Sequence, residues 1–256
     1  MYKRQVYDYS NQLYRDIQNE NVIAAELGYS FRSRLFSANL NSYYTSWQNK
    51  PSNGGVRVMI DEESVRANIN GMDALHKGIE IDFIYKILPN LSIEGLLSLG
   101  DWRWKSSDSL VFYDDDNNLI LNENGDVVNV VFDATDVHVG DAAQAVYASS
   151  IRYEFVKNGY LKLRYTYFTK NYSNFDPFSL VGETGGTDSW RLPNYGLMSA
   201  HAGYRIHFDH SILFFRANVF NALDSFYISD GRNNQNGSSF DASSAGVFIG
   251  QGLRFN

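Results

Sequence analysis

Apolar residues alternate with other residues along most of this chain, most clearly in the segment KGIEIDFIYKI at residues 77–87. Successive side chains of an extended strand point to opposite faces. One face of this segment therefore carries Ile79, Ile81, Phe83, Tyr85 and Ile87, and the other carries Gly78, Glu80, Asp82 and Lys86. Helical periodicity is scarce, so the pattern predicts an all-β chain. Eight strands are expected, in residues 22–31, 35–47, 77–87, 91–104, 146–155, 160–168, 197–208 and 210–230, and a ninth begins in 245–255.

The connections between these runs are of two kinds. Four are short: FRSR at 31–34, KILPN at 86–90, VKNG at 156–159 and HFDH at 207–210. They alternate with long polar segments at 48–65, 105–141, 169–194 and 229–245. A soluble sandwich has no reason to sort its loops in this way. The layout is typical of an antiparallel transmembrane β-barrel with short periplasmic turns and long extracellular loops.

Aromatic residues, 15% of the chain, favour the same fold. Several flank the short turns, and others lie near the long segments; the first set is Phe31, Phe36, Tyr85, Phe155, Tyr160 and Phe208, and the second is Tyr43, Tyr44, Trp47, Trp102, Trp104, Tyr172, Phe226 and Tyr227. Amphipathic rings gather at both membrane interfaces, so two aromatic girdles are expected. The plainer interpretation is that aromatic residues are good strand formers.

Composition excludes several classes of function. The chain has no Cys, so thiolate metal sites and thiol nucleophiles are ruled out. A net charge of −7 argues against nucleic acid as a partner. The five His have no metal-ligand spacing, and His201, expected on the lumen side near several Ser, lacks a nucleophile motif that would support a hydrolase. The acidic segment 114–126 does not fit a calcium loop and is interpreted as solvated. We therefore expect no enzyme activity, metal or cofactor.

Four segments resemble consecutive parts of one family's barrel: IAAELGYSFRSRLFSANLNSYYTSWQNK, GMDALHKGIEIDFIYKILPNLSIEGLLSLGDWRW, SWRLPNYGLMSAHAGYRI and FRANVFNALDSFYISD. They are similar to the C-terminal barrel of TonB-dependent outer-membrane receptors of Gram-negative bacteria. The resemblance covers residues 20–256, with 1–19 as an incoming extracellular loop segment. It implies a barrel of 22 strands around an N-terminal plug that this sequence lacks. The chain is therefore expected to be a fragment of about nine strands.

The resemblance also implies a function and a location. The expected function is active transport across the cell outer membrane, importing a scarce nutrient of the siderophore, cobalamin or oligosaccharide class. The implied partners are outer-membrane lipid, the plug domain, the TonB complex acting through the missing N-terminal part, and a small nutrient ligand. For the glycan-importing subgroup a surface lipoprotein is a further partner. The alternatives are a smaller passive barrel (porin, adhesin or enzyme) and a soluble all-β binding protein.

Candidate site residues fall into two groups. Exposed aromatic residues on loops can stack on sugars or flat chelates, and the first group for ligand binding is Trp102, Arg103, Trp104, Trp190 and Tyr227. The second group is charged and alternates with the apolar positions, so it is expected to face the lumen: Glu80, Asp82, Glu94, Arg152, Glu154, Lys162, Arg164, Arg205 and Arg216. These charges either form a hydrated wall, pairing across strands or contacting the plug, or line the ligand path.

Overall fold

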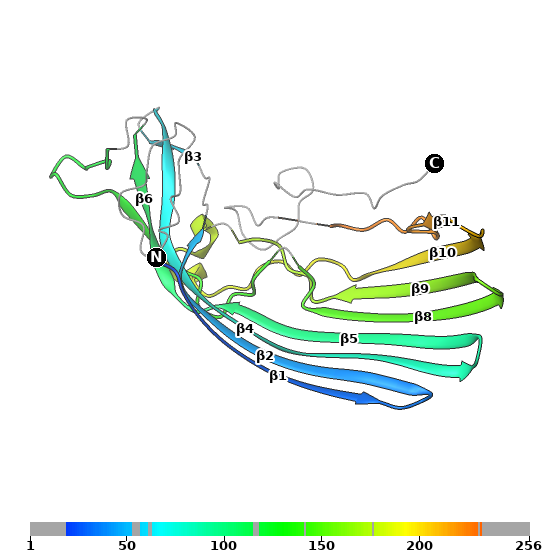
Figure 1. The fold of residues 1–256 in the computed structure, drawn as a ribbon. Helices are drawn as coiled ribbons and strands as arrows, with labels where there is room; N and C mark the ends of the chain where they lie inside the picture. Colours follow the sequence, from blue (N-terminus) through cyan, green and yellow to red (C-terminus); the bar gives the residue numbers. More distant parts are fainter. Residues whose placement is uncertain are drawn as a thin grey trace.

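The computed structural model describes residues 19–52, 57–60, 63–114, 118–140, 142–175, 177–229 and 231. Its main feature is a sheet of eight strands that pair antiparallel in chain order (Figure 1). They are β1 (Asn21–Arg32), β2 (Phe36–Ser52), β4 (Glu63–Leu88), β5 (Leu91–Trp104), β8 (Ala145–Val156), β9 (Gly159–Thr169), β10 (Tyr195–His207) and β11 (Ile212–Val219). The all-β prediction is confirmed. The expected ninth strand and residues 1–18 lie outside the described residues.

The short turns all lie at one end of the sheet and the long connections at the other (Figure 1). Leu88 pairs with Leu91, and Val156 pairs with Gly159, so two of the turns contain only two residues between paired positions. In the second of these turns Asn158 has a φ of 68°, a left-handed conformation that Asn tolerates better than most residues. The predicted sorting of the loops is confirmed.

The strand registers place the alternating residues on two consistent faces. Leu40 pairs with Ile81, Ile81 with Leu97, and Leu97 with Tyr147, which continues the row to Tyr167. Directly paired residues of an antiparallel sheet lie on the same face. The rows therefore build one apolar face across all eight strands, and the intervening positions build a polar face.

The predicted strand in 210–230 is too long. β11 ends at Val219, and the chain then turns, with Asn221 and Asp224 at a φ of 49°. Asn221 stabilises this turn, since its Oδ1 accepts from the Ser225 N–H at 2.9 Å and its Nδ2 donates to the Ser225 carbonyl at 3.0 Å. Asn side chains form such local bonds readily, and here they end the strand despite the apolar pattern.

Two long segments expected to be polar loops, 48–65 and 105–141, contain further strands. These are β3 (Arg57–Ile60), β6 (Ser107–Tyr113) and β7 (Asn129–Asp133), and β4 extends to pair with both β3 and β6. We call residues 57–60, 63–72, 105–114 and 118–139 the loop-end extension. Figure 1 shows it rising away from the eight-strand sheet beyond the long-connection end. Tyr113 and Phe112 pair with Arg66 and Ala67 in this extension.

The main hydrophobic cluster lies at the loop-end extension rather than along the sheet. Its buried members are Met72, Ala74, Trp104, Leu110, Phe112, Phe132, Ala134, Val137 and Leu180. Leu180 comes from a short 3-10 helix, η1 (Pro177–Leu180), which is followed by η2 (Gly182–Thr184). By contrast, all twelve residues of β1 are exposed. Among the described residues no helix has the length and apolarity needed to cross a membrane.

Candidate ligand-binding face

The polar face carries the charges predicted to face a lumen. All nine of these residues occupy the face opposite the apolar rows. Direct pairs on this face include Asn39 with Asp82, Glu94 with Ser150, and Arg152 with Lys162. Because the pairs run from β2 to β9, the charges form a continuous surface across the sheet.

Several of these charges have ionic, hydrogen-bonding or aromatic partners within the face. Lys162 pairs with Glu94, which also accepts from Ser150 Oγ at 3.1 Å. Asn39 Nδ2 donates to the two carboxylate oxygens of Asp82 at 2.9 and 3.2 Å. The Arg152 guanidinium lies 3.8 Å from the centroid of the Tyr160 ring. Cross-strand pairs of this kind fix a charged wall.

Near β11 the charged residues have a different surrounding, because two arginines lie close to one aromatic ring. Arg216 and Arg205 lie 4.4 and 5.4 Å from the centroid of Phe214. His201, considered in the sequence as a hydrolase residue, has its Nδ1 2.8 Å from Asn218 Oδ1. The Asn218 amide and the Phe220 ring, whose centroid lies 5.8 Å from that of the imidazole, hold this histidine as part of the polar wall.

At the long-connection end, the polar face carries a group of rings that we call the mouth cluster: Tyr43, Trp47, His76 and Trp102. Trp102 Nε1 donates to Tyr43 Oη at 2.8 Å, and the Trp102 ring stacks on His76 with centroids 5.5 Å apart. Trp47 follows, 6.3 Å from His76. Lys50 Nζ lies 5.1 Å from the Trp47 centroid, within cation–π range. These rings come from β2, β4 and β5.

The mouth cluster contains polar atoms with no internal partner. Trp47 Nε1 and His76 Nε2 are buried and have no hydrogen-bond partner among the residues that the structure describes. A buried polar group without a partner costs about 1–3 kcal/mol. The mouth cluster therefore keeps two enclosed polar atoms at a cost in stability.

A second set of rings lies on the same face nearer the C-terminal strands. Tyr195 stacks on Phe168 at 4.7 Å and on Tyr227 at 4.3 Å, with interplanar angles of 20° and 17°. Tyr227 was selected from the sequence, whereas Phe168 and Tyr195 were not. Trp190 lies between Phe168 and Tyr195 in the sequence, and its carbonyl accepts from the Ser173 N–H at 2.9 Å.

The structure separates three candidates that are adjacent in sequence. Trp102 lies in the mouth cluster, whereas Arg103 points to the other face. Trp104 was expected to be exposed, but it is only 9% exposed and packs edge-on against Phe175. That expectation is wrong because Phe175, which lies 71 positions later in the sequence, covers the ring. Trp104 therefore packs the hydrophobic cluster.

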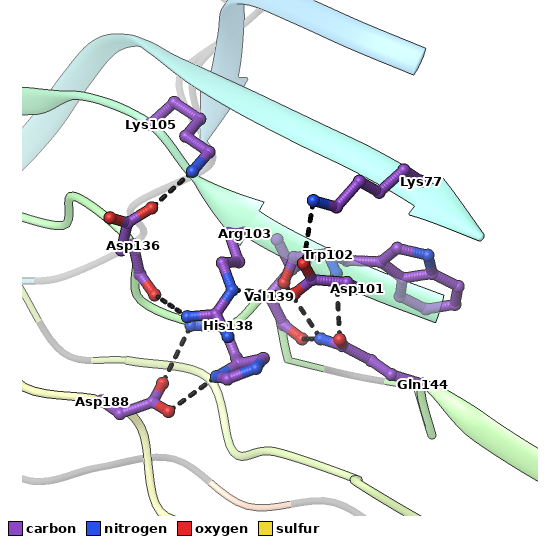
Figure 2. A network of polar contacts seen from close by, with 10 residues as sticks. All are labelled: Lys77, Asp101, Trp102, Arg103, Lys105, Asp136, His138, Val139, Gln144 and Asp188. Atoms are coloured by element: carbon purple, nitrogen blue, oxygen red, sulfur yellow. Dashed lines mark hydrogen bonds and ion pairs between the residues drawn. The ribbon is translucent and has the colours of Figure 1, made fainter. Parts of the chain in front are cut away.

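Arg103 belongs to a polar network on the outward side (Figure 2). Its Nε lies 2.7 Å from Asp101 Oδ1, and its Nη1 donates to the Asp136 carbonyl at 2.9 Å. Lys77 approaches Asp101 at 3.3 Å. Lys105 pairs with Asp136, and this hydrogen bond lowers the pKa of the Asp136 carboxyl. The network ties β4 and β5 to the segment before β8.

Three residues hold the long connections together, and none of them is a candidate site residue in the sequence. His138 Nδ1 donates to Asp188 Oδ2 at 2.6 Å, and the His138 ring stacks on Tyr172 at 3.9 Å with an angle of 4°. Burial raises the pKa of the Tyr172 hydroxyl. His138 and Asp188 are 50 positions apart, and no local pattern in the sequence signals their contact. They connect the chain before β8 to the chain before β10.

Gln144 is a fourth residue that the sequence did not single out. It is 1% exposed, and its Oε1 accepts from the Trp102 N–H at 2.9 Å while its Nε2 donates to the Trp102 carbonyl at 3.0 Å (Figure 2). These two bonds continue the sheet beyond the last β5–β8 pair. Gln144 therefore fixes the backbone that carries Trp102.

The acidic segment 114–126 uses its oxygens locally where the structure describes it. Asp114 Oδ1 accepts from the Asn118 N–H at 2.7 Å, and Asn122 Oδ1 accepts from the Asn124 and Asp126 N–H groups, each at 2.9 Å. In the described part of the chain no group of three or more His, Asp or Glu residues is placed to hold a metal ion.

Comparisons with known proteins identify the fold. No protein-family model matches the sequence, and no curated protein matches it. Among solved structures, the FrpB iron transporter of Neisseria meningitidis (F3-3 variant) aligns over 82% of this chain with 16% identity and a TM-score of 0.50. The copper transporter OprC aligns over 91% with 14% identity and a TM-score of 0.53. This chain covers 27% of the first structure and 29% of the second. The described residues thus have the fold of a section of an outer-membrane β-barrel.

Proposed function

We propose that this chain is part of the barrel wall of a TonB-dependent receptor in the outer membrane, and that the receptor actively imports a scarce nutrient. The apolar face that continues across eight strands carries this proposal. On it Ile23 is 70% exposed and Leu27 is 75% exposed. Apolar area in water costs about 25 cal/mol per Å², and soluble monomers rarely expose more than a few hundred Å² contiguously. A lipid environment removes this cost.

The polar face then lines the lumen, and the mouth cluster lies where a ligand enters from outside. A closed barrel of this family holds a plug domain, and the charged wall supplies its contact surface. The two transporters with this fold carry iron and copper, which favours a metal-bearing ligand of the siderophore or cobalamin class over an oligosaccharide. Active transport requires the TonB complex as energy source.

For ligand contact we propose Trp102, with Tyr43 as its orienting partner, and Tyr227 at the end of the second set of rings. Trp190, in the connection before β10, and Arg103, near the end of β5, stay proposed contacts. A flat chelate can stack on indole and phenol rings such as these. Trp104 is left out because it is packed in the hydrophobic cluster.

The test is uptake by a strain that carries the complete gene as its only route for the ligand. Ferric chelates, cobalamin and an oligosaccharide mixture are offered separately at limiting concentration. We expect uptake of one class, and we expect it to stop when the TonB gene is deleted. Uptake that continues without TonB would identify a passive barrel and overturn the proposal.

A further inference from the structure

The apolar face has a hollow in its centre. It has a volume of about 490 Å³ and spans β4, β5, β8 and β9. Its lining includes Phe83, Gly95, Leu97, Tyr147, Ser149 and Tyr165. A cavity of about 150 Å³ holds one benzene ring, so this hollow has room for a much longer apolar group.

The hollow exists because small residues meet in one row of the sheet. Gly95 pairs with Phe83 on one side and with Ser149 on the other, and Ser149 pairs with Tyr165. The Phe83 ring leans over Gly95, where a Cβ would lie 2.3 Å from a ring carbon. Two small residues thus lie between two large rings.

The next row forms the wall of the hollow toward the long connections. There Leu97 pairs with Tyr147, and Tyr147 pairs with Tyr167, with ring centroids 6.4 Å apart. A tilted strand crosses the bilayer in about 9–11 residues. Ser149 lies seven positions before Val156 at the short turn, so the hollow lies in the half of the membrane nearer the long connections.

We propose that this hollow binds one acyl chain of an outer-leaflet lipid and retains it when bulk lipid exchanges. The site lies on the face that the proposed function places in lipid, and the proposal rests on that placement. A chain in the hollow contacts rings on several sides, whereas a chain on a flat surface contacts one. The tyrosine hydroxyls toward the long connections lie near the polar end of such a lipid.

The test uses native mass spectrometry of the complete protein extracted from the outer membrane in mild detergent. Wild type should keep one lipid through detergent washing. Ser149→Leu fills the hollow, and we expect at least a five-fold lower lipid-bound fraction. Ala217→Leu is the matched control, because it adds the same side chain to an exposed position on the apolar face outside the hollow and should keep the lipid.

Equal retention by Ser149→Leu and Ala217→Leu would overturn the proposal. A second copy of this chain covering the hollow would also overturn the proposal. Ser149→Cys tests this alternative, because this chain has no Cys of its own. A disulfide-linked dimer in membranes would show that a second copy covers the hollow. A protein found in the aqueous fraction would instead refute the membrane placement, so the two failures are distinguishable.

Discussion

Trp102 and Arg103 are neighbours in the sequence, yet they have different surroundings because side chains alternate along β5. The same parity distinguishes Tyr43 from Tyr44 on β2. Tyr43 accepts the Trp102 indole hydrogen bond on the polar face at 2.8 Å, whereas Tyr44 lies on the apolar face and is 49% exposed. These two tyrosines therefore form a matched pair for testing the mouth cluster.

We expect Tyr43→Phe to weaken the affinity of the transported ligand by about five-fold, since a neutral hydrogen bond contributes about 1 kcal/mol. Without its partner the Trp102 N–H is left unpaired, and the ring loses its fixed orientation. Tyr44→Phe should leave affinity unchanged. The measurement is the half-saturating ligand concentration for uptake, and equal values for both variants would show that the mouth cluster does not contact ligand.

The sequence predicts the face of a strand residue well, because the face depends only on parity. The sequence does not predict whether residues far away along the chain bury that side chain. Trp104 follows the same alternation as Trp102, but Phe175 covers it. His138, Asp188 and Gln144 meet their partners across 42 to 50 positions, so no local pattern marks them.

At the scale of elements, the loop-end extension has a hydrophobic cluster of its own. Phe132→Ala should destabilise it by about 3–5 kcal/mol, the usual effect of truncating a buried Phe. Hydrogen exchange should show faster exchange in β6 and β7, with β8 and β9 unchanged, because these two strands contribute no residue to the cluster. Faster exchange throughout the sheet would contradict this division.

The extension should also lose stability as pH rises. Burial raises the pKa of Asp108, and the nearby Asp73 adds to the effect. A carboxyl whose pKa is raised by folding favours the folded state in its protonated form, so its contribution is present below the ordinary value of about 3.9 and is lost above the raised pKa. The Oδ2 atom of Asp108 has no hydrogen-bond partner in the described part of the chain.

Asp108→Asn should therefore slow exchange in β6 and β7 at pH 7, after correction for intrinsic rates, and should have no effect below about pH 4. Asp136→Asn is the control of opposite sign. The hydrogen bond from Lys105 lowers the pKa of Asp136, so any stability it contributes is present at neutral pH and lost in acid. A protein with Asp108→Asn that exchanges faster at pH 7 would refute the argument.

The sequence gives less information on this extension than on the sheet. Val130 and Phe132 alternate like any strand, but the Asp, Asn and Gly residues of 114–126 precede them, so a polar loop is the natural expectation. Only pairing with β6 makes β7 a strand. By contrast, the runs on either side of each short turn are strongly alternating and form hairpins with local contacts, which is why they were predictable.

At the scale of the molecule, the described sheet begins at β1 and ends at β11, and each of these strands pairs with one neighbour in the described part of the chain. Unpaired backbone groups in lipid cost several kcal/mol each. Residues 20–229 expressed alone should therefore aggregate in detergent. The complete gene product should give a compact monomer whose mobility in cold SDS gels changes on heating. A monodisperse monomer of the shorter piece would show that these edges can close on each other.

The apolar face contacts lipid, whereas the hydrophobic cluster of the loop-end extension is packed by protein. This difference affects which substitutions each part of the sequence tolerates. Lipid chains are fluid and fit any apolar shape, so Ile23 and Leu27 can exchange with other aliphatic residues at little cost. Phe112 and Phe132 are enclosed by fixed neighbours and tolerate few replacements. Among natural variants the membrane wall should thus change faster than the core of the exposed extension, the reverse of the usual order in which surface loops vary most.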